Sequence, residues 1–168
     1  MLKPTMTLAV LLALCTAAFA QTTDVPIMGN IASKCVITTD TPGVYGNPSK
    51  NILSTDPIDG GVLPIVRYDI IEADAYKAQI AWPREFSTSP LLNDVVNWTG
   101  GVELAEVSDA NMADFETNKI QFDNVTEYDL TLAGSAWFKI TSKADYGFNK
   151  SLPGGQYRAG VIAECIAK

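Results

Sequence analysis

The sequence predicts an all-β domain with the roughly seven or eight short strands of a β-sandwich. Runs rich in β-branched and aromatic residues are separated by turn-forming tripeptides, and no long helical pattern interrupts them. Within several runs apolar and polar residues alternate, which gives a strand one core face and one solvent face. The turn signals are Thr41-Pro42-Gly43, Gly46-Asn47-Pro48, Asp59-Gly60-Gly61, Thr99-Gly100-Gly101 and Pro153-Gly154-Gly155.

Residues 1–20 have the pattern of a secretory signal peptide. Lys3 supplies a positive start, residues 8–14 are apolar, and Ala18-Phe19-Ala20 is a small-x-small cleavage site. The apolar stretch is well short of the roughly 20 residues that span a bilayer, so a membrane anchor is the weaker interpretation. Cys15 loosely fits a lipobox, but the bulky residue before it does not suit that motif. We therefore expect export, with Cys15 removed with the signal.

Removal of residues 1–20 would leave 148 of the 168 residues, enough for one domain with its own core. This part carries 19 acidic and 11 basic residues, because Lys3 is one of the 12 in the whole chain, and its net charge is −8. Such a charge disfavours binding to nucleic acid or to an anionic membrane surface. We expect no nucleic acid partner and no membrane insertion.

The first expected strand covers residues 25–31 and places Val25, Ile27, Gly29 and Ile31 on one face. A strand so close to the N-terminus of the exported chain could pair with another molecule, which points to assembly rather than catalysis. The following strands are expected at 35–39, 62–71 and 75–81, and the last of these alternates clearly.

The second half of the chain continues this pattern. A short helical turn is expected at 109–116, where Asp109 could cap a segment that carries Met112 and Phe115. Alternation is clear again from Leu130 to Ile140. The remaining strands are expected at 95–107, 120–125, 128–141 and 157–167.

Two cysteines of the exported part, Cys35 and Cys165, lie near its opposite ends. An oxidising compartment favours a disulfide between them, and closing so long a loop would stabilise by roughly 4–5 kcal/mol in the chain-entropy model. Two buried free thiols are the alternative. A metal site is disfavoured because the chain has no histidine and two thiolates do not complete a tetrahedral site. We expect no cofactor.

The residue types of the common hydrolases are missing. Without histidine, neither a Ser-His-Asp nor a Cys-His arrangement can be built. Carboxylate pairs such as Glu103 with Glu106 or Asp109 with Asp114 are better interpreted as solvated surface than as glycosidase pairs. The segment 56–60 lacks the ligand spacing of a calcium loop and is interpreted as a turn. The sequence therefore predicts no enzyme.

Two segments near the ends carry a resemblance to a known family. Val25-Pro26-Ile27-Met28-Gly29-Asn30-Ile31-Ala32-Ser33-Lys34-Cys35 resembles the N-terminal region of chaperone-usher pilins, where a donor strand with a small residue leads into a cysteine. Leu152-Pro153-Gly154-Gly155-Gln156-Tyr157-Arg158-Ala159-Gly160-Val161 is similar to the pilin ending, in which a Pro/Gly turn and a tyrosine precede the final strand. Residues 66–104 look more loosely like the body of colonisation-factor pilins.

The resemblance implies a divergent fimbrial subunit with an immunoglobulin-like sandwich that lacks one strand. A periplasmic chaperone would lend that strand, and at the outer-membrane usher the N-terminal extension of another subunit would replace it. The product would be a homopolymeric surface fibre that supports adhesion. It also implies a signal peptide at 1–20, a donor-strand extension at 21–34 and a sandwich domain at 35–168.

The same resemblance assigns roles to single residues. Val25, Ile27 and Ile31 would fill pockets of the acceptor groove, and Gly29 would pass a point too shallow for a side chain. A Cys35–Cys165 bond would tie the first strand to the last, whereas the usual pilin disulfide joins two early strands. The strand at the edge of the groove would carry Gly155, Tyr157, Ala159, Val161 and Ala163.

Two other functions stay open at the level of sequence. A stand-alone secreted β-sandwich could bind a carbohydrate or protein ligand, and its residues 25–31 would pair within their own chain. Trp82, Trp98 and Trp137 could stack on a sugar, although a core role suits Trp82 and Trp137 better. A small secreted enzyme would need two acidic side chains facing each other in a cleft.

Overall fold

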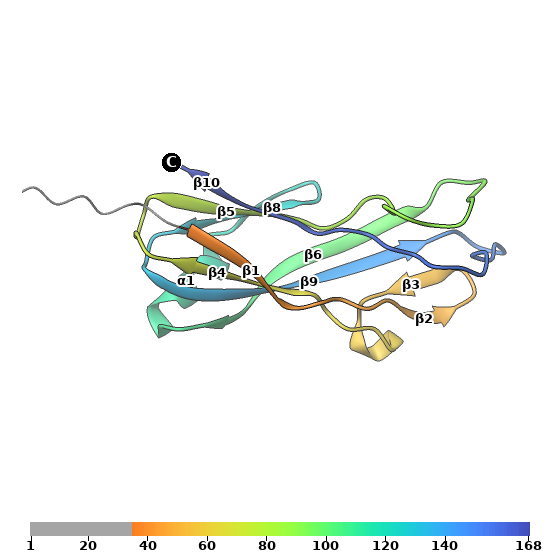
Figure 1. The fold of residues 1–168 in the computed structure, drawn as a ribbon, viewed down its shortest axis with the longest axis horizontal. Helices are drawn as coiled ribbons and strands as arrows, with labels where there is room; N and C mark the ends of the chain where they lie inside the picture. Colours follow the sequence, from red (N-terminus) through yellow and green to blue (C-terminus); the bar gives the residue numbers. More distant parts are fainter. Residues whose placement is uncertain (1–34) are drawn as a thin grey trace, which may run out of the picture. The chain divides into compact units, whose positions relative to one another are not determined.

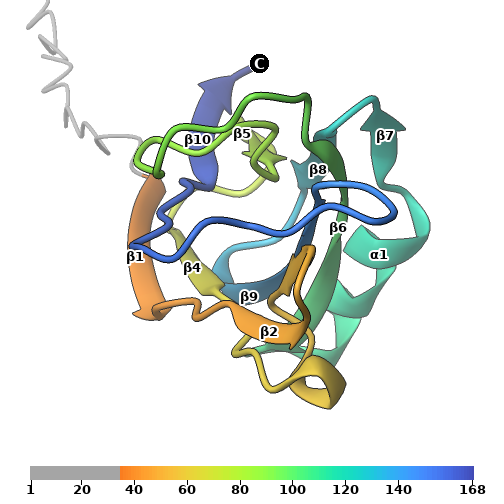
Figure 2. The ribbon, with the colours of Figure 1, turned by 90° about the vertical axis from the view of Figure 1, so that its right-hand side faces the viewer.

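The computed structural model describes residues 35–168, which form two antiparallel β-sheets packed face to face (Figures 1 and 2). The signal peptide expected at 1–20 and the donor strand with Val25, Ile27, Gly29 and Ile31 lie outside the described residues. The elements are β1 (Cys35–Thr41), β2 (Gly46–Ser49), β3 (Ile52–Ser54), η1 (Pro57–Asp59), β4 (Ile65–Ile70), β5 (Tyr76–Ala81), β6 (Asn97–Val107), η2 (Ala110–Ala113), α1 (Asp114–Thr117), β7 (Ile120–Phe122), β8 (Val125–Leu130), β9 (Gly134–Asp145) and β10 (Ile162–Ala167).

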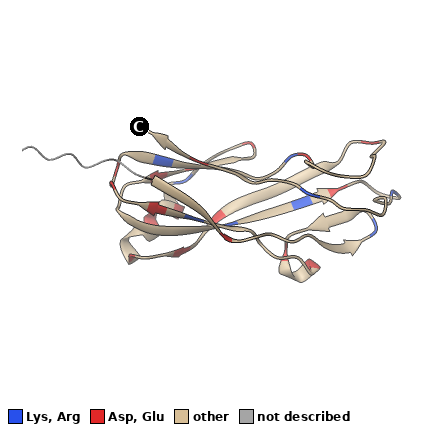
Figure 3. Ribbon diagram, viewed as in Figure 1, with Lys and Arg blue, Asp and Glu red and all other residues tan. Residues whose placement is uncertain are grey.

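The larger sheet has the order β1-β4-β9-β3-β2, and β6 pairs with the other edge of β9. The smaller sheet has the order β10-β5-β8-β7. Every strand pair in both sheets is antiparallel. The prediction of an all-β chain with two sheets is therefore confirmed. Residues of both charges lie on both sheets (Figure 3), for example in the pairs Glu103–Lys139 and Lys77–Glu127.

The core lies between the two sheets and contains the apolar positions of the alternating runs. In β9 the buried residues Ala136, Phe138 and Ile140 alternate with partly exposed neighbours, as predicted. Trp82 is buried as well, but Trp137 points to the outer face, where its Nε1 donates to Asp40. The core role predicted for Trp137 is wrong, because the two-residue period that buries Ala136 and Phe138 turns the residue between them outward.

Three local features differ from the predicted elements or refine them. The strand predicted at 120–125 is a hairpin, because Asp123 has a φ of 56° and reverses the chain between β7 and β8. The strand predicted at 128–141 is split into β8 and β9, which belong to different sheets. The helical turn is confirmed: Asp109 accepts a hydrogen bond from the Asn111 N–H at 2.8 Å, and Met112 and Phe115 are buried.

The last strand begins later than predicted. β10 starts at Ile162, so of the expected groove-edge residues only Ala163 lies in a strand. Residues 155–161 continue toward the other end of the sandwich outside any β-strand pairing, apart from one isolated bridge between Arg158 and Thr88. This difference from the sequence prediction matters most for function, because residues 155–161, which lie outside any β-ladder, border an opening between the sheets.

Candidate functional site

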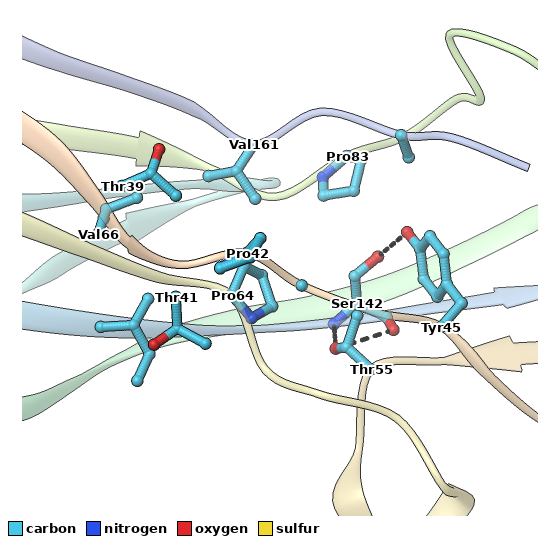
Figure 4. A pocket seen from close by; sticks show the side chains of 13 residues that line it. Thr39, Thr41, Pro42, Tyr45, Thr55, Pro64, Val66, Pro83, Ser142 and Val161 are labelled. Atoms are coloured by element: carbon cyan, nitrogen blue, oxygen red, sulfur yellow. Dashed lines mark hydrogen bonds between the residues drawn. The ribbon is translucent and has the colours of Figure 1, made fainter.

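An opening runs between the edges of the two sheets on the side where β1 and β10 lie. Its borders are residues 42–45, which follow β1, and residues 155–161, which precede β10; we call it the seam groove. Three adjoining hollows that share lining residues extend it to residues 47–50 and 151–155. Figure 4 shows the first hollow, with Val161 and Pro83 on one side and Pro42, Pro64 and Tyr45 on the other.

Proline explains why the sheets stay apart here. Pro42 follows directly after β1, Pro64 directly precedes β4, and Pro83 comes shortly after β5. Proline has no backbone N–H and cannot donate to a ladder, so each strand stops at the groove. All three prolines line the first hollow. They are the signal in the sequence that could have located this site, and the sequence prediction did not use it.

The floor of the first hollow carries hydroxyl groups that are already paired. Tyr45 Oη lies 2.9 Å from Ser142 Oγ, and the backbone N–H of Ser142 donates to Thr55 Oγ1 at 2.9 Å. Burial raises the pKa of Tyr45 above its ordinary value, although the hydrogen bond to Ser142 opposes part of that effect. Tyr45 therefore remains a neutral hydroxyl over the physiological pH range, and no charged side chain lines this hollow.

The backbone along one border has free hydrogen-bonding capacity within the described part of the chain. Arg158 uses its N–H and its carbonyl on Thr88, at 2.8 and 3.3 Å. Between Arg158 and Ile162 the backbone makes no hydrogen bond to any other residue of 35–168. Buried or half-buried backbone groups need partners, so this border is suited to pairing with an added strand.

The seam groove is closed at the end where β1 and β10 come together. Cys35 and Cys165 form the predicted disulfide, with their Cα atoms 6.2 Å apart. Beside it, Tyr68 crosses from the larger sheet, and its hydroxyl lies 3.3 Å from the carbonyl of Gln79 and 3.2 Å from that of Glu164. Burial raises the pKa of Tyr68 above its ordinary value, so it stays a neutral donor to the smaller sheet.

Aromatic rings pack beneath the open part of the groove. Phe86 makes edge-to-face contacts with Trp98 and Tyr157, with ring centroids 4.7 and 5.0 Å apart, and a longer one with Tyr45 at 6.4 Å. These contacts engage Trp98, so its ring is part of the packing rather than a free stacking platform. Tyr157 is half-buried there, and Gly155 packs so closely on Pro90 that a Cβ would come within 2.5 Å of the proline ring.

Three of the carboxylates considered from the sequence have structural partners. Glu103 forms an ion pair with Lys139, Asp109 caps the helical turn, and Asp56 accepts a hydrogen bond from the N–H of Ile58 in η1. Among residues 35–168 there is no group of three or more histidine, cysteine or acidic residues that could hold a metal ion. The same residues contain no helix long and apolar enough to cross a membrane.

Of the predicted site residues, the structure brings together Tyr157, Ala159 and Val161 along the seam groove, with Gly155 at its open end. Ala163 lies beyond the closed end of the hollows, in β10. Comparisons with protein family models, with curated proteins and with solved structures find no match to this chain.

Proposed function

We propose that residues 35–168 are the incomplete immunoglobulin-like sandwich of a fimbrial subunit. In this proposal the seam groove receives an extended strand from residues 21–34 of a neighbouring copy. The observation that carries it is the groove itself: an opening between two sheet edges whose first hollow has no charged lining residue, bordered between Arg158 and Ile162 by backbone that has no partner within 35–168. An added strand would supply those hydrogen bonds and cover the apolar lining.

The dimensions and chemistry of the groove support this occupant. Its border at 155–161 has the same number of residues as the alternating segment 25–31. The first hollow has a volume of about 220 Å³, which is room for one or two apolar side chains such as Ile27 or Val25. The adjoining hollows, of about 480 and 400 Å³, continue this space along the border, as an extended strand requires.

The proposed function implies an assembly pathway. Before assembly, a periplasmic chaperone occupies the groove, because an unpaired apolar opening makes an isolated subunit prone to aggregation. At the outer-membrane usher, the extension of the next copy replaces the chaperone strand. Each contact joins two different surfaces and leaves another pair free, so the copies form an open surface fibre that supports adhesion. The chain is then a structural subunit and not an enzyme.

The test is the size distribution of the full-length chain exported from its native host, on a denaturing gel with and without boiling. We expect a ladder of polymers that collapses to monomer on boiling. The ladder disappears when residues 21–31 are deleted, and also in the full chain with Ile27→Asp, which places a charge in an apolar hollow. Asp24→Asn, a neighbouring change of similar size, keeps the ladder.

The contrary result is a single monomer band for the intact chain, with a deleted form that unfolds more easily. Residues 25–31 would then pair within their own chain. The secreted sandwich that binds a carbohydrate or protein ligand would replace the fimbrial subunit.

A further inference from the structure

The sandwich has two ends of different character. At one end β4 finishes at Ile70 opposite Cys35, so the disulfide and the exposed side chain of Ile71, which is 55% exposed, lie together. We call this the disulfide end, on the left in Figure 1. At the other end Asn97 pairs with Asp145, so the loops that precede β6 and follow β9 meet there. We call this the loop end; it faces the viewer in Figure 2.

The loop end exposes large apolar side chains. Leu91, Val95 and Phe148 are 85%, 81% and 90% exposed, and we call them the loop-end patch. Their two loops are tied together by an ion pair of Lys150 with Asp94, with 3.0 Å between Nζ and Oδ2. Three such side chains on loops that are held together offer apolar area that a partner could cover.

The disulfide sets the direction in which a strand can occupy the seam groove. Inserting a strand between β1 and β10 needs two strand spacings, about 9–10 Å, whereas the Cα atoms of Cys35 and Cys165 are 6.2 Å apart. The groove is therefore open only toward Gly155, at the loop end. A bound strand that continues into a folded domain has to leave the groove there.

Chain length then decides which surfaces meet. Ile31 and Cys35 are separated by four Cα-to-Cα steps, which span at most about 14 Å. When residues 25–31 of one copy lie in the groove of another, the disulfide end of the first copy is held close to the loop end of the second. The reverse direction would require the chain to leave the groove through the end that the disulfide closes.

We infer that the loop-end patch is the docking surface for the disulfide end of the next copy of this chain, with Phe148 and Ile71 on the facing surfaces. This inference rests on the proposed function and adds a second contact to it. Donor-strand pairing connects consecutive copies, and burial of the patch sets how one copy is oriented on the next. Burial of the patch between copies would also account for the presence of large apolar side chains that are exposed in a single copy.

Cysteine cross-linking tests this contact in the full exported chain. The double variant Ile71→Cys with Phe148→Cys is treated with a flexible bismaleimide and boiled. We expect a ladder that now survives boiling, because each junction is covalently linked. Each single variant forms only the heat-sensitive ladder. A matched control pairs Phe148→Cys with Ile58→Cys, since Ile58 is 94% exposed on η1, on the side of the sandwich.

The outcomes separate the two proposals. A heat-sensitive ladder without boil-resistant bands, or equal cross-linking of the Ile58 control, would overturn the docking surface while donor-strand pairing stands. Absence of any heat-sensitive ladder in the unchanged chain would remove the proposed function and this inference together.

Discussion

Trp82 illustrates how a single side chain decides which substitutions its neighbours tolerate. It is buried, and its indole packs on Gly100 of β6, where a Cβ would lie 2.8 Å from the ring and 2.5 Å from the carbonyl oxygen of Thr141. The next residue, Gly101, has room, since a Cβ there would meet only Thr141 Oγ1 at 3.4 Å. Two adjacent glycines thus have different structural roles that their sequence context does not distinguish.

We predict that Gly100→Ala lowers the free energy of unfolding by about 1–3 kcal/mol, because the methyl group forces Trp82 or the Thr141 backbone to shift. Gly101→Ala is the control and should leave stability unchanged or raise it by up to about 1 kcal/mol, since alanine suits a strand better than glycine. Urea titration of both variants measures the difference. Equal losses in the two variants would contradict the packing of Trp82 on Gly100.

At the scale of elements, β10 depends on few connections. It pairs with β5 along one edge, and its link to the larger sheet is made by the disulfide to β1 and the hydroxyl of Tyr68. β1 is likewise an edge strand, paired with β4. The end at which the groove is closed is therefore held by side chains rather than by a backbone ladder.

We predict that replacing Cys35 and Cys165 together by alanine lowers the free energy of unfolding by roughly 2–5 kcal/mol, the range for a native disulfide that closes a long loop. Urea titration measures the change. The unchanged chain, unfolded in the presence of a reductant, is the control and should lose about as much. Identical midpoints for the oxidised chain and the double variant would show that the bond contributes nothing to holding β1 and β10 together.

At the scale of the whole molecule, the seam groove joins segments that are distant in the chain, and its free volume is what an added strand would use. Ala159 lies between the first two hollows and lines both of them. Ile162, at the start of β10, is 61% exposed and does not line either of these hollows. The two positions allow the same aromatic side chain to be placed inside and outside the groove.

We predict that Ala159→Phe abolishes the heat-sensitive ladder, because its ring occupies the space that the donor strand needs. Ile162→Phe adds a ring outside the groove and should leave the ladder intact. Gels of unboiled exported protein compare the two variants, and circular dichroism of each confirms that the β-sheet content is unchanged. A ladder of normal length in Ala159→Phe would mean that the seam groove is not the site of strand pairing.

Much of the local structure could be predicted from the sequence. Alternation located β5 and the buried face of β9, Asp109 marked the helical turn, and the two cysteines that follow residue 20 pointed to the bond of Cys35 with Cys165. These features depend on periodicity, capping and composition, which act over a few residues or on the chain as a whole. The same local rules missed the reversal at Asp123 and the short strands β2 and β3.

The sequence by itself determined that this chain folds from short strands with one apolar face each, and that Cys35 and Cys165 can pair. Only the tertiary structure decided that residues 42–45 and 155–161 border one groove, that the disulfide closes that groove at one end, and that Leu91, Val95 and Phe148 share the other. The physical reason is the distance along the chain over which each kind of interaction acts. Turn chemistry and alternation are local, whereas the spacing of two sheet edges results from the packing of every strand between them.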